Sequence, residues 1–217
     1  MRQPRRRAWP VHIYGVGDAA STVVDAEYRR GATQAHSATH LVNAALRQML
    51  GDGTHQAGSY NKPGYLRFDF SWGQALSDAT KSEIEEIANV AVRDNLEVTT
   101  RVLSLDEAKA AGAMALFGEK YGDNVRVLSM GGDFSVELCG GIHANRTGDI
   151  SLLKIVSEGG VAAGVRRIEA LTGDGVFKYY ENLEQELNEL DQLLEQSSSL
   201  PGGRESRQER KDGAGKK

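Results

Sequence analysis

Two short motifs constrain the fold of this chain more than any other feature of its sequence. His36 and His40 stand four residues apart, and so do Cys139 and His143, about a hundred residues further on. The chain has five histidines and one cysteine, so these motifs hold most of its soft metal-binding side chains. Imidazole and thiolate are the groups that zinc prefers, and two helical residues four apart lie on one face. A fold that brings both motifs together would form a zinc site.

Several kinds of chemistry remain open for such a site. If all four side chains bind at once, the site is closed and typically structural. If His143 gives way to water or substrate, bound zinc lowers the pKa of water and polarises an ester carbonyl. Cys139 beside a histidine is also a candidate nucleophile, although the paired histidine spacing favours metal. Alternatively, His36 and His40 lie on a helix surface and Cys139 is a small buried apolar residue.

Length and composition point to an ordinary globular protein. The 217 residues suffice for one sizeable domain with appendages, and 40% apolar and 26% charged residues are typical values. No apolar stretch approaches the ~18 residues of a membrane span, and the basic start lacks the apolar run of a secretory signal. A single cysteine excludes an internal disulfide. We therefore expect a reducing compartment, by default the cytoplasm.

The net charge of −4 is divided unevenly along the chain. Residues 1–30 carry six arginines against three acidic residues, and residues 197–217 carry six basic residues against three acidic ones. Residues 31–196 carry 14 basic and 24 acidic residues. A nucleic-acid-binding protein usually has a broad basic surface, so a polyanion would have to meet a local basic patch or the two ends.

The pattern of elements predicts an α+β fold, with helices packed on a largely antiparallel sheet. Apolar periodicity predicts helices over residues 35–50 and 77–95, and a capping box of Ser104 and Glu107 predicts a third helix to about residue 116. Alternating or β-branched segments predict strands over residues 66–70, 97–103, 124–130, 134–138, 150–157 and 164–171.

The ends are expected to differ from the domain over residues 31–180. Residues 1–30 are expected to be a basic segment with short extended pieces, the remnant of a small β unit. A helix from about residue 177 carries a heptad seam within residues 181–196, which is typical of a short coiled coil that self-associates or binds a partner helix. Residues 197–217 are expected to form a disordered basic tail. The seam consists of Leu183, Leu187, Leu190 and Leu194.

Seven segments, in order and without large gaps from about Val24 to Tyr180, resemble the editing domain of alanyl-tRNA synthetase. The metal motifs alone would also suit the related threonyl editing domain, but the segments between them are similar to the alanyl one. The segments are His36–Leu41, Gln56–Ser59, Leu66–Phe70, Ala115–Tyr121, Glu137–His143, Arg146–Ile150 and Gly164–Ala170.

The resemblance implies a fold, an activity and a cofactor. The fold is that of the threonyl and alanyl synthetase second additional domain. The activity is aminoacyl-tRNA deacylation, the hydrolysis of the ester joining serine or glycine to the 3′ end of alanine tRNA. The cofactor is Zn²⁺, and the residues that match the family's zinc ligands are His36, His40, Cys139 and His143.

The resemblance also implies roles for residues around the metal. Gln56 matches a polar position lining the amino-acid pocket, and Thr39, beside His40, is a second candidate for that pocket. Both are assigned to the catalytic site, because a polar pocket can hold the serine hydroxyl and reject alanine, which leaves buried groups unpaired. Arg166 and Arg167 are expected near the tRNA end. Glu137 is a candidate general base or a partner that orients a histidine.

Two departures from the family qualify these expectations. Ile142 stands where the family usually has threonine, which removes a hydroxyl beside the metal. No segment resembles the aminoacylation half of a synthetase, so we expect a free-standing editing protein or a detached synthetase piece. The alternative function is a non-catalytic, zinc-containing module that binds tRNA.

Overall fold

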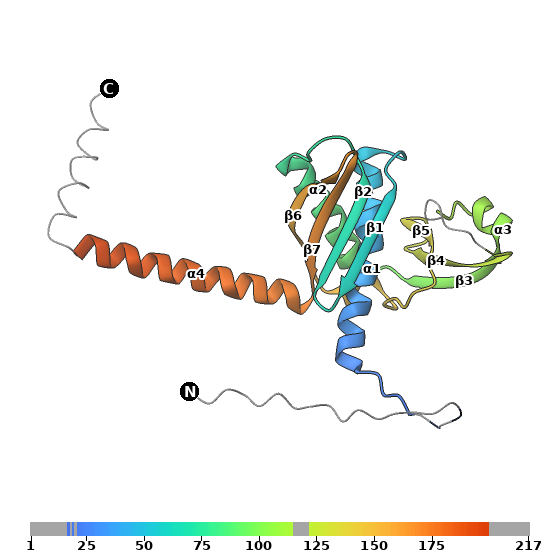
Figure 1. Ribbon diagram of the computed structural model, residues 1–217, viewed down its shortest axis with the longest axis horizontal. Coiled ribbons are helices and arrows are strands. Elements are labelled where there is room, and N and C mark those ends of the chain that lie inside the picture. Colours follow the sequence, from blue (N-terminus) through green and yellow to red (C-terminus); the bar gives the residue numbers. More distant parts are fainter. Residues whose placement is uncertain (1–16, 18, 20, 115–121, 200–217) are drawn as a thin grey trace.

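The computed structural model describes residues 17, 19, 21–114 and 122–199. Within these residues, four α-helices accompany two antiparallel sheets (Figure 1). One sheet has the strand order β1-β2-β7-β6 and the other the order β3-β4-β5. The predicted α+β class is confirmed, with the strands divided between two sheets.

The predicted elements are largely present, together with two further elements and one extension of a predicted helix. Strand β1, the short 3-10 helix η1 and the first third of α1 have no counterpart in the sequence-based prediction. The elements, in chain order, are α1 (Ala26–Leu50), β1 (Gln56–Lys62), β2 (Tyr65–Ser71), α2 (Asp78–Arg93), β3 (Val98–Ser104), α3 (Leu105–Ala110), β4 (Asn124–Met130), β5 (Ser135–Leu138), η1 (Thr147–Ile150), β6 (Leu153–Ala162), β7 (Val165–Thr172) and α4 (Asp174–Ser199).

Helix α1 begins nine residues earlier than its apolar pattern predicts. The Asp25 side chain caps it by accepting a hydrogen bond from the backbone N–H of Tyr28. Residues 26–34 contain no large aliphatic side chain, so they carry no periodic apolar signal, and the expectation of extended structure is wrong for residues 26–30. The expected extended pieces at residues 11–16 lie outside the described part.

The main core lies between the four-stranded sheet and the helices α1 and α2, which cover one of its faces (Figure 1). Strand β2 alternates as predicted, so that Leu66, Phe68 and Phe70 are all fully buried against the helices. Ile168 and Ala170 of β7 are buried in the same layer. This packing holds α1 rigidly, and α1 carries the first histidine pair.

The second sheet and α3 form a smaller lobe beside the main body (Figure 1). Its own apolar cluster is built around Ala108, Val125, Val127 and Leu138. Strand β4 also sends Leu128 and Met130 into the main core. Strand β4 therefore joins the two lobes and fixes the position of β5, its neighbour in the sheet.

Two predicted boundaries shift for local reasons. Helix α3 has the predicted capping box but ends at Ala110, because Gly112 adopts a left-handed conformation with φ 76° and the chain turns away. Strand β6 starts at Leu153, three residues late, because η1 occupies residues 147–150. The family-like segment at residues 115–121 lies outside the described part.

Helix α4 extends away from the body as an arm (Figure 1). Val176 in its first turn is fully buried, and residues 197–199 are still helical. The predicted disorder is therefore wrong for residues 197–199, and residues 200–217 lie outside the described part. None of the described helices is long and apolar enough to cross a membrane.

Candidate metal centre

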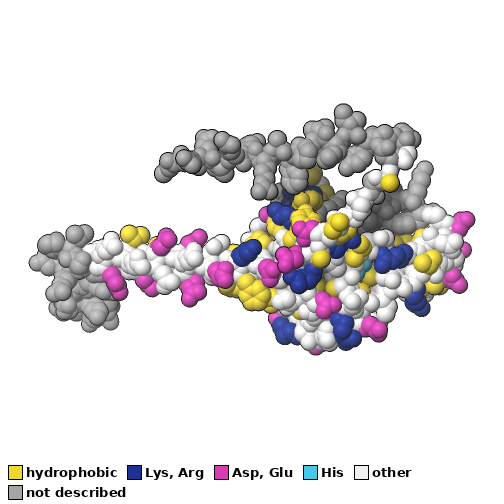
Figure 2. Space-filling model, turned by 90° about the horizontal axis from the view of Figure 1, so that it is seen from below, with side chains coloured by type: hydrophobic (Ala, Val, Ile, Leu, Met, Phe, Trp, Pro, Cys, Tyr) yellow, Lys and Arg dark blue, Asp and Glu magenta, His cyan; other side chains and the backbone are white. Residues whose placement is uncertain are grey.

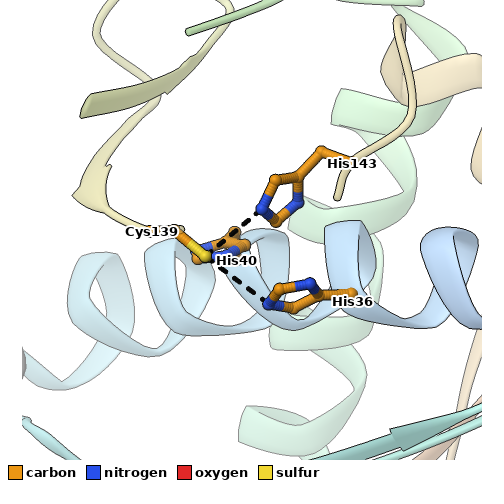
Figure 3. A group of neighbouring side chains, drawn as sticks. All are labelled: His36, His40, Cys139 and His143. Carbon is orange, nitrogen blue, oxygen red and sulfur yellow. Dashed lines mark hydrogen bonds between the residues drawn. The ribbon is translucent and has the colours of Figure 1, made fainter. Parts of the chain in front are cut away.

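The structure brings the two sequence motifs together at one point. His36 and His40 lie one turn apart on α1, and Cys139 and His143 lie on the loop that follows β5 (Figure 3). One potential ligand atom from each of the four side chains falls within 4.8 Å of all the others. The main body therefore supplies two donors, and the chain leaving the smaller lobe supplies the other two.

The sulfur of Cys139 lies near two imidazole nitrogens at distances typical of a zinc site. The Cys139 Sγ atom lies 3.6 Å from Nε2 of His36 and 3.3 Å from Nε2 of His143 (Figure 3). Zinc bonds of about 2.1 Å to nitrogen and about 2.3 Å to sulfur at a tetrahedral angle separate the donors by about 3.6 Å. Both of these sulfur–nitrogen separations are thus close to the value that zinc requires.

His40 is held from its other side by a buried carboxylate. Its Nδ1 atom lies 2.8 Å from Oε2 of Glu137, and Ser135 donates a hydrogen bond of 2.9 Å to Oε1. Nε2 of His40 is buried on the side of Cys139 and makes no hydrogen bond of standard geometry among the described residues. Buried polar atoms are normally satisfied, so this nitrogen fits a bond to a metal. Glu137 thus lies where a partner that orients a histidine is expected, and a role as general base stays a prediction.

Burial and neighbouring charges act in opposite directions on this cluster. Burial alone would raise the pKa of the Cys139 thiol, but interactions with His143 and His36 outweigh it and lower that pKa to about 3. Burial alone would lower the pKa of His40, but the charge of Glu137 outweighs it and raises that pKa to about 9. These shifts favour a thiolate beside a protonated His40, and zinc binding would release the proton on Nε2 of that histidine.

The loop after β5 approaches α1 so closely that only glycine fits at one position. A Cβ atom on Gly141 would lie 2.2 Å from Cε1 of His36, well inside contact distance. The Arg126 guanidinium on β4 donates hydrogen bonds to the carbonyl oxygens of Gly141 and Cys139. The smaller lobe thereby fixes the loop that carries the two later donors.

Ser37 connects the helix to the same loop. Its hydroxyl oxygen accepts a 2.9 Å hydrogen bond from the backbone N–H of Ala144 and lies 3.4 Å from Nδ1 of His143. The His143 ring is thus held with Nε2 toward the sulfur of Cys139. Neither Ser37 nor Arg126 stands out in the sequence, because their partners are distant in the chain and neither residue type signals such a role.

Comparison with known proteins gives the same assignment as the motifs. The family described as "Threonyl and Alanyl tRNA synthetase second additional domain" matches residues 125–169. The chain is 63% identical over 164 residues to the Alanine–tRNA ligase of Clavibacter sepedonicus. These residues make up 76% of this chain and 18% of that protein. It is 57% identical over 182 residues to the Alanine–tRNA ligase of Pseudomonas fluorescens, 84% of this chain and 21% of that protein.

The chain is an alanyl-tRNA synthetase editing-domain-like protein. The resemblance seen in the sequence is confirmed. The chain spans about a fifth of the length of the curated relatives it matches. The donor types, their proximity and the similarity of the chain to this family thus all suit the cluster to a metal ion.

The two residues predicted for the amino-acid pocket of the editing-domain-like chain lie on different elements. Thr39 on α1 is buried, and its hydroxyl lies 2.9 Å from the carbonyl oxygen of Ala35 and 2.7 Å from Oδ1 of Asn61. Gln56, at the start of β1, is partly exposed and donates a 3.2 Å hydrogen bond to Ser59. Thr39 is therefore engaged within the fold, whereas Gln56 has only a surface partner.

The two arginines predicted to meet tRNA are both paired with carboxylates. Arg167 makes two hydrogen bonds to Asp69 of β2, at 2.7 and 2.8 Å. Arg166 pairs with Glu158, whose side chain is 3% exposed. These pairs link β7 to its neighbours β2 and β6, so both arginines have a structural contact, and a tRNA contact stays a prediction.

Proposed function

We propose that this editing-domain-like chain is a zinc-dependent aminoacyl-tRNA deacylase, which hydrolyses the ester of serine or glycine on alanine tRNA. The observation that carries the proposal is the convergence of three histidines and one cysteine in a chain similar to alanine–tRNA ligases. Its substrate would be the tRNA that such a ligase charges with the wrong amino acid. The proposal places the chain in the cytoplasm.

The four donors would hold the ion, and each has a defined support. His36 is packed against Gly141, His40 faces Glu137, and His143 lies against Ser37. When bound, zinc supplies a positive charge that polarises an ester carbonyl or activates a water molecule. Glu137 would keep the Nδ1 proton of His40 in place and thereby keep Nε2 free to bind.

Discrimination between serine and alanine would come from polar side chains near the ester. Gln56 is the better candidate, because its amide makes a single exposed hydrogen bond that a substrate can replace. Thr39 would need to exchange its buried contacts with Ala35 and Asn61. An alanine ester would leave the polar group without a partner, which is the usual basis of strong discrimination by a hydrogen-bonding site.

The proposal is tested by following serine release from serine-charged alanine tRNA. We expect the purified chain to release serine, a chelator to stop it, and added zinc to restore it. Alanine-charged tRNA is the matched control and should be spared. Release that continues unchanged in zinc-free protein would contradict a zinc-dependent reaction.

Substitution of Cys139 separates metal chemistry from nucleophilic catalysis. Cys139→Ala should lose zinc and serine release together, whereas Cys139→Asp should keep part of both, since a carboxylate can bind zinc but is a poor nucleophile here. A Cys139→Ala protein that keeps zinc and loses only activity would indicate a cysteine nucleophile instead.

The second candidate function is a non-catalytic zinc-containing module that binds tRNA. It is favoured by one observation, that the protein itself provides four donors, a full tetrahedral set. In that case the chain would bind charged tRNA and retain zinc but release no serine. The same assay, combined with a measurement of tRNA binding, distinguishes the two functions.

A further inference from the structure

Helix α4 presents an apolar stripe that the rest of the described chain does not cover. Leu187, Leu190 and Leu193 are 62%, 55% and 60% exposed. The helix leaves the body after its first turns and extends outward (Figure 1). Most helical stability in proteins comes from packing of an apolar face. The stripe therefore lacks the packing that normally stabilises such a helix.

The spacing of the stripe is that of a coiled coil. With Leu187 at heptad position a, Leu183 and Leu190 fall at d, and Leu193 widens the stripe at g. The charged residues that flank the seam at positions e and g are Glu184, Glu186 and Asp191. In a coiled coil, these flanking positions face the partner helix and decide which helix is accepted.

The flanking charges disfavour pairing between two copies of this helix. In a parallel pair, Glu186 of one copy would face Asp191 of the other, and in an antiparallel pair acidic residues would again face acidic residues. Residues 181–199 contain no Lys, Arg or His that could relieve this repulsion. Acidic side chains lie along the whole arm, with a basic one only near its base (Figure 2).

We propose that α4 is a docking arm for a different helix, one whose apolar stripe is flanked by Lys or Arg. The partner would bury the leucines and place its basic side chains against Glu184, Glu186 and Asp191. None of the ion pairs found within the described part of the chain involves these three residues. Their charge is thus available to select a partner.

Two synthetic helices serve as probes against the full-length chain. The basic probe carries leucine at positions a and d and lysine at e and g, and the acidic probe copies residues 174–199. We expect fluorescence anisotropy to show binding of the basic probe, weakened at least about tenfold when salt rises from about 0.05 to about 0.5 M. The acidic probe should not bind at low salt, and the chain should sediment as a monomer.

Substitutions on the arm test where the probe binds. Leu187→Asn with Leu190→Asn should weaken binding of the basic probe at least about tenfold and leave the fold intact, because both leucines are exposed. Glu184→Lys with Glu186→Lys should reverse the preference toward the acidic probe. Glu181→Lys with Glu189→Lys makes the same change in charge on the outer side of the helix and serves as the matched control.

Three results would overturn the proposal. One is equal binding of the acidic and basic probes by the parent chain. Another is a loss of binding in the Glu181 and Glu189 control as large as that in the Glu184 and Glu186 variant, which would indicate unspecific charge attraction. The third is stable self-association of the parent chain that Leu187→Asn with Leu190→Asn abolishes.

Discussion

At the scale of single residues, Gly141 determines how closely the loop after β5 can approach α1. Gly141→Ala would place a methyl group in the position of the His36 ring, so the ring or the loop must move. We expect zinc affinity to fall at least about tenfold, as for other losses of support around a metal site. Metal titration monitored by the absorption of bound Co²⁺ measures both the affinity and the distortion of the ligand set.

Gly140 provides a matched control in the same loop. A Cβ atom at this position meets no other atom within 4 Å, so Gly140→Ala should bind metal as the parent does. Equal losses in both variants would show that loop flexibility matters and the contact with His36 does not.

We propose Glu137 as a positioning residue in this site, and its charge is the property to test. Glu137→Gln keeps the size of the side chain but removes the charge beside Nδ1 of His40, so zinc should bind about 10- to 100-fold more weakly. Ser135→Ala removes only one hydrogen bond to the carboxylate and should have a smaller effect. A competition titration with a zinc chelator compares the two. An unchanged affinity in Glu137→Gln would contradict the role.

Gln56→Ala should lower the ratio of the deacylation rates of the serine and alanine esters more than it slows release of serine. A pocket with an unpaired donor penalises alanine by about 1–3 kcal/mol, and removing that donor removes the penalty. Paired deacylation rates on the two charged tRNAs measure the effect, and zinc content should not change. Ser59→Ala removes only the partner of Gln56 and is the control. A ratio of rates that stays constant would direct attention to Thr39.

At the scale of elements, the segment that follows α4 is predicted to be dispensable for folding. Residues 200–217 carry six of the chain's 26 basic residues and little apolar sequence, so deleting them should leave the fold and zinc content unchanged. The same deletion should weaken tRNA binding and reduce its dependence on salt. Circular dichroism, metal analysis and a tRNA titration at two salt concentrations check this. A truncated protein that fails to fold would show that the tail contributes packing.

At the scale of the whole molecule, a bound metal would join the two lobes. Two donors belong to a helix of the main core, and two follow a strand of the smaller sheet. At free zinc about a thousandfold above its dissociation constant, binding stabilises the folded state by about 4 kcal/mol. A chelator should therefore lower the melting temperature, and zinc should restore it. Cys139→Ala is the control that should no longer respond to the chelator.

Local features of the sequence predicted much of this architecture. Leu66, Phe68 and Phe70 alternate because one face of β2 is buried, and that pattern is visible without the fold. The cap at Ser77 and the capping box of Ser104 and Glu107 are contacts between residues three apart, so the sequence alone determines them. The types and spacing of the four candidate ligands are also visible in the sequence alone.

Only the tertiary structure decided the rest, because the deciding contacts join residues far apart in the chain. Strand β1 is polar and exists through its pairing with β2, so it has no apolar pattern of its own. The contact between His40 and Glu137 spans two elements that meet only after both lobes pack. The chain thus encodes its donor atoms locally, while the position and electrostatic environment of those donors arise from long-range packing, which no local pattern reports.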